Sequence, residues 1–181
     1  MTIHSLNGAL TLQELGFKRV VLSRELSTSE IEYICNNSNI ETECFVHGAL
    51  CISYSGQCLF SSMIGGRSGN RGKCAQPCRL PYELLEDDKK IDSGYLLSTR
   101  DLCGLDYIPF FIKAGVTCLK IEGRMKSPAY VATVTRIYRK YIDLAYSSET
   151  YKVSSKDKEE LMQVFNRGGF SCGHLDNSYN Q

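Results

Sequence analysis

Segments with the periodicity of β-strands alternate with segments of helical periodicity along this chain of 181 residues. Such alternation is typical of parallel βαβ units, because two parallel strands are joined by a crossover that is usually a helix. The pattern restricts the fold to the α/β class, either a doubly wound sheet or part of a barrel. The strand-like runs are residues 2–5, 19–23, 43–50 and 117–124, and the helix-like runs are 9–15, 29–37, 101–115 and 128–145.

Several helix boundaries carry their own side-chain signals. Ser27 followed by Glu30 has capping-box spacing, in which each side chain accepts a hydrogen bond from a backbone N–H at the helix start. Ser127 and Pro128 supply a cap and a first-turn proline for the last long helix, and Gly16 is suited to end the first one. These signals support the alternation independently of hydrophobic periodicity.

We expect an incomplete (βα) barrel of the TIM type with a cysteine-rich insertion. A closed barrel has eight βα units in about 250 residues, whereas only four or five units are visible here. Residues 1–150 are expected to form the C-terminal part of the barrel, including a cysteine-rich loop at 51–80, and 151–181 to begin a following, truncated segment. A longer parent chain or a partner would supply the missing strands.

The pattern of residues 81–98 predicts a hairpin with its turn at 86–92.

Composition places the chain among ordinary globular proteins, with 43% hydrophobic and 23% charged residues. No stretch has the roughly 18 consecutive apolar residues of a membrane-spanning helix, and the opening residues lack the pattern of a signal peptide. We therefore expect a cytoplasmic protein without a membrane partner. The formal net charge of +1 excludes a strong overall attraction to nucleic acid, so any such attraction requires a local patch.

Four cysteines, Cys51, Cys58, Cys74 and Cys78, lie in one glycine-rich, basic segment with little strand or helix periodicity. The chain has nine cysteines, an odd number, and no export signal. Reducing cytosol keeps such thiols free or bound to metal, which argues against a disulfide. The remaining interpretations are an iron–sulfur cluster, a zinc site, or free thiols that include a nucleophile.

The spacing of these cysteines favours an iron–sulfur cluster over zinc. Thiolate ligands select zinc or iron–sulfur clusters rather than calcium or magnesium. Structural zinc sites use pairs of closely spaced cysteines, and only Cys74 and Cys78 have that spacing. Cys51 and Cys58 are too far apart for such a pair, whereas ligand spacing for iron–sulfur clusters is looser. Zinc stays the alternative metal.

Two further features belong to this candidate metal site. Arg67 and Arg71 would offset the negative charge of thiolate ligands, although the same run also fits a solvated loop. Cys103 is a fifth candidate ligand and a substitute for Cys78, because we place it at the start of the 101–115 helix, after a strand. The carboxyl ends of strands form the face on which barrels build active sites. A half-buried helix cysteine is the alternative interpretation of Cys103.

Charged side chains on two predicted strands indicate a polar cavity. Even spacing puts Glu43 and His47 on one face of their strand, and Lys120, Glu122 and Arg124 on one face of another. Charges on a buried strand must be paired or face a cavity. In the functional interpretation, Lys120 and Arg124 bind carboxylates of a small substrate, and Glu122 or His47 acts as acid or base. In the structural interpretation, these charges form a network that only stabilises the barrel.

A basic surface suited to RNA would consist of loop and helix cations. Such cations contact phosphates without reading sequence, and Tyr54 and Tyr82 could stack on a displaced base. The alternative is that these side chains are only solvated. The cations are Arg67, Arg71, Lys73 and Arg79 in the loop and Arg136, Arg139 and Lys140 on the last long helix.

Three stretches, ECFVHGALCISYSGQC, GRSGNRGKCAQPCR and LKIEGRMKSPAYVA, resemble the collagenase-like peptidase family, the thirty-second among peptidases of unknown mechanism. The resemblance extends from HSLNG near the start to FNRGGFSCGHL. It implies a barrel fold and, for many members, oxygen-independent hydroxylation of RNA bases or quinone precursors. It further implies a 4Fe–4S cluster, prephenate as hydroxyl donor, and RNA as partner, with a tRNA wobble uridine or an rRNA cytidine as the target.

The family label also leaves a peptidase as the alternative function. The sequence offers little machinery for it, because it contains neither the HExxH motif of zinc proteases nor the G-x-S-x-G motif of serine hydrolases. A Cys–His pair from His47 and Cys51 would be about 13 Å apart along a strand, beyond hydrogen-bonding reach. The resemblance and the residues together therefore favour an RNA-modifying hydroxylase.

Overall fold

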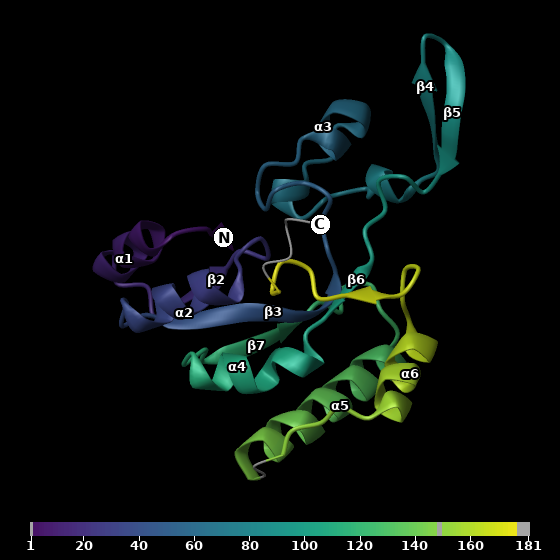
Figure 1. The fold of residues 1–181 in the computed structure, drawn as a ribbon. Coiled ribbons are helices and arrows are strands. Elements are labelled where there is room, and N and C mark those ends of the chain that lie inside the picture. The colour runs from purple at the N-terminus through teal and green to yellow at the C-terminus, as the bar shows by residue number, and fades with distance from the viewer. Residues whose placement is uncertain (1, 148–149, 177–181) are drawn as a thin grey trace. The chain divides into compact units, whose positions relative to one another are not determined.

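The computed structural model describes residues 2–147 and 150–176, which divide into two compact units (Figure 1). The sheet unit comprises the described parts of residues 1–50 and 100–181, and the cysteine unit comprises residues 51–99. The cysteine unit is thus an insertion between two segments of the sheet unit.

The sheet unit contains one mixed six-stranded sheet with the order β1-β2-β3-β6-β8, and β7 also pairs with β3. The pairs β1–β2, β2–β3, β3–β7 and β6–β8 are parallel, whereas β3–β6 is antiparallel. The alternation of strands and helices is confirmed. The sheet was expected to be parallel, but it contains one antiparallel pair, β3–β6. The strands are β1 (Thr2–Ile3), β2 (Arg19–Leu22), β3 (Glu41–Ala49), β6 (Asp101–Cys103), β7 (Cys118–Ile121) and β8 (Phe170–Ser171).

The helices of this unit begin where the sequence supplies caps. The Ser5 side chain accepts from Gly8 N–H, so α1 begins earlier than hydrophobic periodicity indicated. The capping box of Ser27 and Glu30 is present as expected, and Ser127 Oγ accepts from Tyr130 N–H in the first turn of α5. The helices are α1 (Leu6–Glu14), α2 (Thr28–Asn36), α4 (Ile108–Lys113), α5 (Pro128–Ser147) and α6 (Ser155–Val164).

The expected helix at 101–115 is wrong in its first half. Residues Asp101–Cys103 form strand β6, a short 3₁₀ turn covers Leu105–Tyr107, and only then does α4 begin. The physical reason is pairing with segments distant in sequence, since Asp101 is the antiparallel partner of Ala49 and its carboxylate accepts from Arg167. Cys103 therefore ends a strand instead of starting a helix.

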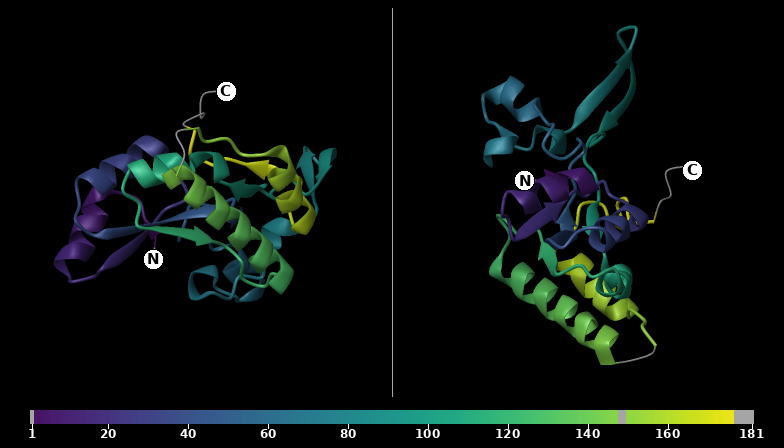
Figure 2. Two further views of the ribbon diagram at one scale, coloured as in Figure 1. Left: turned by 90° about the horizontal axis from the view of Figure 1, so that it is seen from below. Right: turned by 90° about the vertical axis from the view of Figure 1, so that its left-hand side faces the viewer.

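Helix α5 carries much of the core on one face. Its buried face includes Tyr130, Val134, Ile137 and Tyr141, whereas Val131 on the same helix is 46% exposed. In the left view of Figure 2, which is seen from below, α5 runs across the sheet unit. Strand positions expected in the sheet are confirmed, including those of β2, β3 and β7. Closure into a barrel stays a prediction, since the paired strands form one open order.

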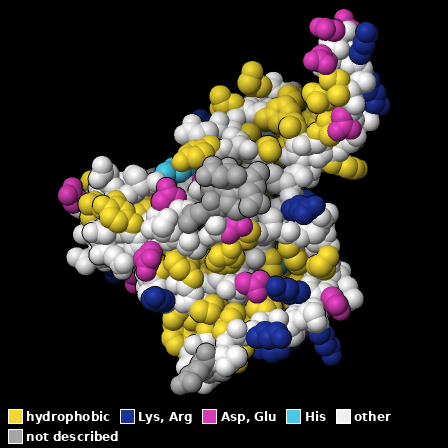
Figure 3. All heavy atoms as spheres, in the orientation of Figure 1, with side chains coloured by type: hydrophobic (Ala, Val, Ile, Leu, Met, Phe, Trp, Pro, Cys, Tyr) yellow, Lys and Arg dark blue, Asp and Glu magenta, His cyan; other side chains and the backbone are white. Residues whose placement is uncertain are grey.

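The cysteine unit has almost no hydrophobic core. Of residues 51–99, only Ser61 and Pro77 are buried, while Met63 is 83% exposed and Tyr95 67%. Figure 3 shows hydrophobic side chains on the surface of α3 and the hairpin. Folded units of this size need a metal, a disulfide or another partner to compensate for a missing core. The elements are α3 (Phe60–Gly65), two 3₁₀ turns (Gly69–Arg71 and Pro77–Arg79), β4 (Tyr82–Glu86) and β5 (Lys89–Gly94).

The expected hairpin is present, but its turn is tighter than the predicted 86–92. Asp87 and Asp88 connect β4 to β5 with φ values of 50° and 61°. Two central residues with positive φ match the right-handed twist of the strands, and aspartate tolerates this conformation better than most residues.

In the described part of the chain, no helix is long and apolar enough to cross a membrane.

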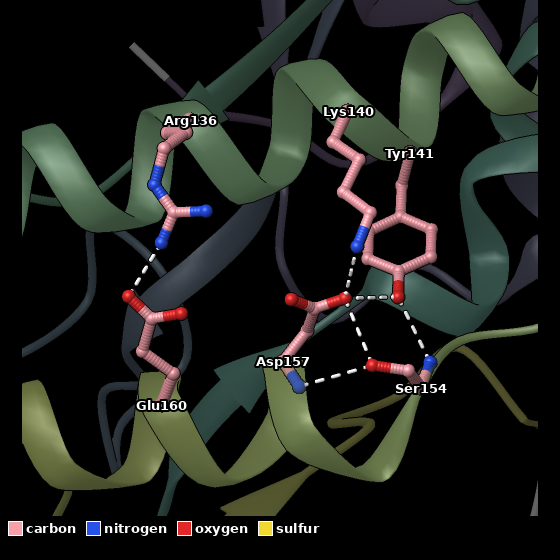
Figure 4. A network of polar contacts seen from close by, with 6 residues as sticks. All are labelled: Arg136, Lys140, Tyr141, Ser154, Asp157 and Glu160. Carbon is pink, nitrogen blue, oxygen red and sulfur yellow. Dashed lines mark hydrogen bonds and ion pairs between the residues drawn. The ribbon is translucent and has the colours of Figure 1, made fainter.

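Buried polar contacts join α5 to α6 around one carboxylate (Figure 4). Asp157 Oδ2 accepts from Lys140 Nζ at 2.7 Å, from Tyr141 OH at 2.6 Å and from Ser154 Oγ at 2.9 Å. These bonds, led by the one from Lys140, lower the pKa of Asp157 from 3.8 to about 2. Ser154 N–H also donates to Tyr141 OH at 2.8 Å. The start of α6 is thereby attached to the middle of α5.

Replacing Asp157 with Asn should lower the free energy of unfolding at pH 7 by about 2 kcal/mol, because hydrogen bonds to a charged acceptor contribute about 1.5 to 3 kcal/mol. The corresponding fall in Tm is about 4 to 8 °C. A pKa that is lower in the folded state gives stability above the unfolded value, which is lost as pH falls. The difference in Tm should therefore be full above about pH 4 and shrink toward pH 2.

Glu160→Gln is the matched control on the same helix. Glu160 pairs with Arg136 of α5, but the two side chains are 39% and 55% exposed, so the change should cost at most about 0.5 kcal/mol. Thermal melts of the three proteins between pH 2 and pH 8 measure both effects. Equal losses in the two variants would contradict the assignment of Asp157 as the buried acceptor.

Candidate functional site

The carboxyl ends of β2, β3 and β7 meet around Arg24. Arg24 Nη1 donates to Ala49 O at 2.9 Å, and Nη2 lies 3.6 Å from Glu122 Oε2. The guanidinium carbon lies 3.7 Å above the ring centre of Phe45. Ligand sites of α/β proteins lie at this end of parallel strands. Sequence reasoning missed Arg24, although its place directly after the second strand was a usable signal.

The shared face expected for Lys120, Glu122 and Arg124 is present only in part. Strand β7 ends at Ile121, so Lys120 alone lies on the strand. Glu122 turns toward Arg24, and its Oε1 accepts from the backbone N–H of Arg124 at 3.0 Å. The Arg124 side chain is exposed and makes no ion pair with any residue that the structure describes. Of Lys120 and Arg124, the two cations predicted to bind carboxylates, Arg124 is therefore the one without an ion pair to a described residue.

Glu43 belongs to an ion-pair network on the sheet. Its Oε1 accepts from Lys120 Nζ at 2.7 Å, and Arg19 Nη1 lies 3.9 Å from Oε2. The Glu43 side chain is 14% exposed, and the hydrogen bond from Lys120 is the main reason that its pKa is lowered. Glu43 is thus an ionised, paired carboxylate. These ion pairs agree with the interpretation in which the strand charges form a stabilising network. They agree less well with a role of Glu43 as a base.

His47 lies in the core and does not share a face with Glu43. The register of β3 against β7 shifts between Phe45 and His47, and this irregularity ends the two-residue alternation on which that expectation depended. The ring is 1% exposed, its Nδ1 lies 3.3 Å from Tyr138 OH, and its centre is 5.4 Å from that of Phe170. Burial lowers the pKa of His47 to about 4, so the imidazole is neutral near pH 7.

Cys103 shares this environment, since it is the antiparallel partner of His47. Tyr138 OH contacts both His47 and the Cys103 side chain. It also donates to Val46 O at 2.7 Å and accepts from Gly104 N–H at 3.1 Å. Burial raises the pKa of Cys103, which keeps the thiol protonated. A buried, protonated thiol beside a neutral imidazole lacks the activation that a nucleophilic cysteine requires.

A tight loop follows β7 and approaches β3 closely. Lys126 N–H donates to Gly123 O at 3.0 Å, and Met125 has φ of 63° and is 93% exposed. A non-glycine residue in the left-handed region is strained, and such strain is concentrated at functional sites. Gly48 faces this loop, and a β-carbon at that position would lie only 2.6 Å from Glu122 O. Only glycine permits this approach of the two strand ends.

The cysteine unit brings its four thiols into electrostatic reach of one another. The pKa of Cys78 is raised, first by burial and then by the charges of Cys51, Cys74 and Cys58, and Arg79 opposes the shift. Gln76 N–H donates to Cys74 Sγ at 3.3 Å. Among the described residues, no group of three or more His, Cys, Asp or Glu side chains is placed so that it could hold a metal ion. The loop thus carries four soft donors in one unit, and binding a metal would require them to move closer together.

Two of the loop cations contact the backbone of their own unit. Arg67 Nε donates to Lys73 O at 3.0 Å, and Arg79 Nη1 donates to Thr99 O at 2.6 Å. Arg71 ends the first 3₁₀ turn. The predicted cofactor-binding pair of Arg67 and Arg71 therefore includes one residue that orders the loop itself.

The helix cations expected to contact RNA are paired within the protein. Figure 3 shows Lys and Arg side chains over α5, but Arg136 pairs with Glu160, Arg139 with Asp143 and Lys140 with Asp157. These pairs reduce the positive potential that this face would present to phosphates. Of the two aromatic candidates, Tyr54 is 53% exposed, and Tyr82 donates to Pro77 O at 2.9 Å.

The fold and these sites define an α/β protein with a candidate thiolate metal centre and a polar cluster at strand ends. Residues 1–181 match the sequence profile of Peptidase family U32, and the chain belongs to this family. It is 43% identical over 165 residues to the tRNA hydroxylation protein P1 of Bacillus subtilis, covering 86% of this chain and 39% of that protein.

Two other relatives differ in the activity that their names give. The 23S rRNA 5-hydroxycytidine C2501 synthase of Escherichia coli is 43% identical over 143 residues, covering 78% of this chain and 22% of that protein. The collagenase of Porphyromonas gingivalis is 38% identical over 166 residues, covering 82% and 40%. The chain spans about two fifths or less of these relatives. No solved structure matches it.

Replacing Gly48 with Ala should destabilise the sheet unit and displace Glu122. The new β-carbon would meet Glu122 O at 2.6 Å and Glu122 Cβ at 2.9 Å, and φ of +106° is unfavourable for alanine. Gly115→Ala is the control, because φ is +80° there but nothing lies within 4 Å of the added carbon. We expect a loss of about 1 kcal/mol for Gly115→Ala and at least twice that for Gly48→Ala, measured by urea unfolding. Similar losses would show that the strand end tolerates the contact.

Proposed function

We propose that this chain is part of an enzyme that hydroxylates a base of tRNA or rRNA, with an iron–sulfur cluster bound by Cys51, Cys58, Cys74 and Cys78. The observation that carries the proposal is that four cysteines share one unit that has almost no core, in a chain whose relatives include proteins named for hydroxylation of tRNA and of rRNA. Zinc is the alternative metal for the same donors.

The cysteine unit fits a bound cluster in two respects. Four thiols are the donor set that soft metals select, and glycines at 56, 65, 66, 69 and 72 let the backbone approach the sulfurs closely. Metal binding also supplies folding free energy, which this unit needs because its own core is so small. A 4Fe–4S cluster, when bound, supplies one-electron chemistry. Cys103 would be a ligand only by leaving its contact with Tyr138.

The strand-end cluster supports binding of a small carboxylate donor such as prephenate. Arg124 is exposed and its guanidinium offers the two-pronged geometry that suits a carboxylate. Lys120 is already paired with Glu43, so its role is to hold the sheet charges in place. Arg24 Nη2 lies 3.6 Å from Glu122 Oε2, and the Arg124 backbone N–H donates to Oε1, so Glu122 is the candidate acid or base beside Arg124.

A peptidase is the second candidate, supported by the name of the collagenase relative. The contacts of the histidine and cysteine residues argue against a Cys–His nucleophile from His47 and Cys103, since both are buried and their pKa values shift away from an activated pair. The surroundings of these two residues therefore do not support a Cys–His peptidase.

Replacing Cys51 or Cys58 with Ser in the full-length protein should remove bound iron and expose the cysteine unit to proteolysis. The physical reason is that the metal would replace the missing core, so its loss leaves residues 51–99 without stabilisation. Iron content and absorbance near 400 nm after anaerobic purification measure the first effect, and limited proteolysis followed by mass spectrometry measures the second.

Cys35→Ser is the matched control, because Cys35 lies in the sheet unit with its thiol 3.3 Å from Thr42 Oγ1. That variant should keep its iron and its protease resistance. Equal iron content in all variants would refute the ligand assignment, and equimolar zinc in place of iron would support the alternative metal. Peptide cleavage by the iron-free protein would favour the peptidase.

Replacing Arg124 with Gln should raise the KM for prephenate about tenfold, equivalent to about 1.4 kcal/mol, because the variant loses a charged partner for the carboxylate. Its Tm should not change, since the side chain is exposed and unpaired among the described residues. Lys120→Gln should instead lower the Tm by removing the partner of Glu43. Mass spectrometry of hydroxylated bases gives the rates. A reversed pattern, with KM sensitive only to Lys120, would move the donor site onto the strand.

A further inference from the structure

A pocket of about 320 Å³ lies at the carboxyl ends of β1 and β2, between the first turns of α1 and α2. Arg24, Glu122 and Arg124 are not among the residues that line it. Its volume is at the lower end of the range for small-ligand pockets, about 300 to 1,000 Å³. The size suits one planar ring with substituents.

The apolar part of the pocket suits the faces of a ring. Leu26 and Ile34 are buried and form part of its wall, whereas the Tyr33 ring is 58% exposed at its edge. An exposed tyrosine beside a buried apolar wall is the arrangement on which nucleobases stack. A ring entering the pocket would be covered on one face by Tyr33.

The polar part of the pocket presents acceptors and carries negative charge. Glu30 lines it, and the hydrogen bonds from the backbone and side chain of Ser27 lower the pKa of this carboxyl, so it is ionised. Both bonds reach Oε2, at 2.8 and 2.7 Å, which leaves Oε1 as an acceptor. His4 also lines the pocket, and its Nδ1 lies 4.0 Å from Glu25 Oε2. Two carboxylates near one small pocket disfavour an anionic ligand.

We propose that this pocket binds a nucleobase of the RNA substrate, with the ring stacked on Tyr33 and a ring or exocyclic N–H donating to Glu30. A nucleobase is planar, neutral and rich in N–H donors, so it complements both parts of the pocket. The inference rests on the proposed RNA substrate. It assigns base and donor to different places, because a dicarboxylate is repelled by Glu30 but attracted by Arg124.

The binding test uses the full-length protein and a short single-stranded RNA that carries the fluorescent base 2-aminopurine. Stacking on Tyr33 should quench the fluorescence, and Tyr33→Ala should weaken binding about tenfold, the effect expected for loss of one stacking partner. Tyr146→Ala is the matched control, since Tyr146 is 72% exposed on α5 and outside the pocket. The control should bind the RNA like the unmodified protein.

A second variant tests the pocket independently of the tyrosine. Ser29 is exposed and lines the pocket, so Ser29→Phe should fill the space without burying a new side chain in the core. It should block quenching while the Tm stays unchanged. Competition with cytidine and uridine shows whether the free nucleoside suffices or the RNA strand is required, and prephenate should not compete.

The outcomes separate this inference from the proposed function. Quenching that depends on Tyr33 and Ser29 supports the pocket even if the protein hydroxylates no RNA. Hydroxylation and RNA binding that are unchanged in both variants overturn the pocket and leave the proposed function intact. Displacement of the probe by prephenate would also overturn it, because it would show that the pocket accepts the anionic donor.

Discussion

Strand β3 is the element on which the rest of the sheet unit depends, because it pairs with β2 and β7 in parallel and with β6 in antiparallel orientation. It is nine residues long, and its two halves have different neighbours. The first half carries Glu43, whose carboxylate connects β2 to β7 through Arg19 and Lys120. The second half carries His47, which packs against α5 through Tyr138. The irregularity between them separates a charged surface from a buried aromatic core.

The same irregularity explains why the strand-end cluster has its observed composition. Once the alternation is broken, Gly48 can approach the backbone of Glu122, and Glu122 N–H donates to His47 O at 2.8 Å. Arg24 then contacts both strand ends at once, through Ala49 O and the Glu122 carboxylate. The position of the candidate acid or base is therefore determined by backbone geometry as well as by its charged neighbour.

Sequence patterns predicted the elements with local signals and failed where distant contacts decide. The capping box at Ser27 and the helix start at Ser127 depend on neighbouring residues, and both are confirmed. Strand β6 was missed because its extended form depends on the pairing of Asp101 with Ala49 and Arg167, residues distant in sequence. Cys51, Cys58, Cys74 and Cys78 were selected because they share one glycine-rich segment, and their role as metal ligands stays a prediction. Arg24 was missed because its partners come from two other strands.

The antiparallel pairing of β3 with β6 also has a consequence for how this chain can vary. Ala49 and Asp101 are paired in the sheet, so the inserted cysteine unit leaves and re-enters the fold at neighbouring points. Insertions are tolerated where the flanking backbone already meets, because the closure entropy is supplied by the host. We therefore expect that the cysteine unit can change in length without altering the strand order of the host sheet.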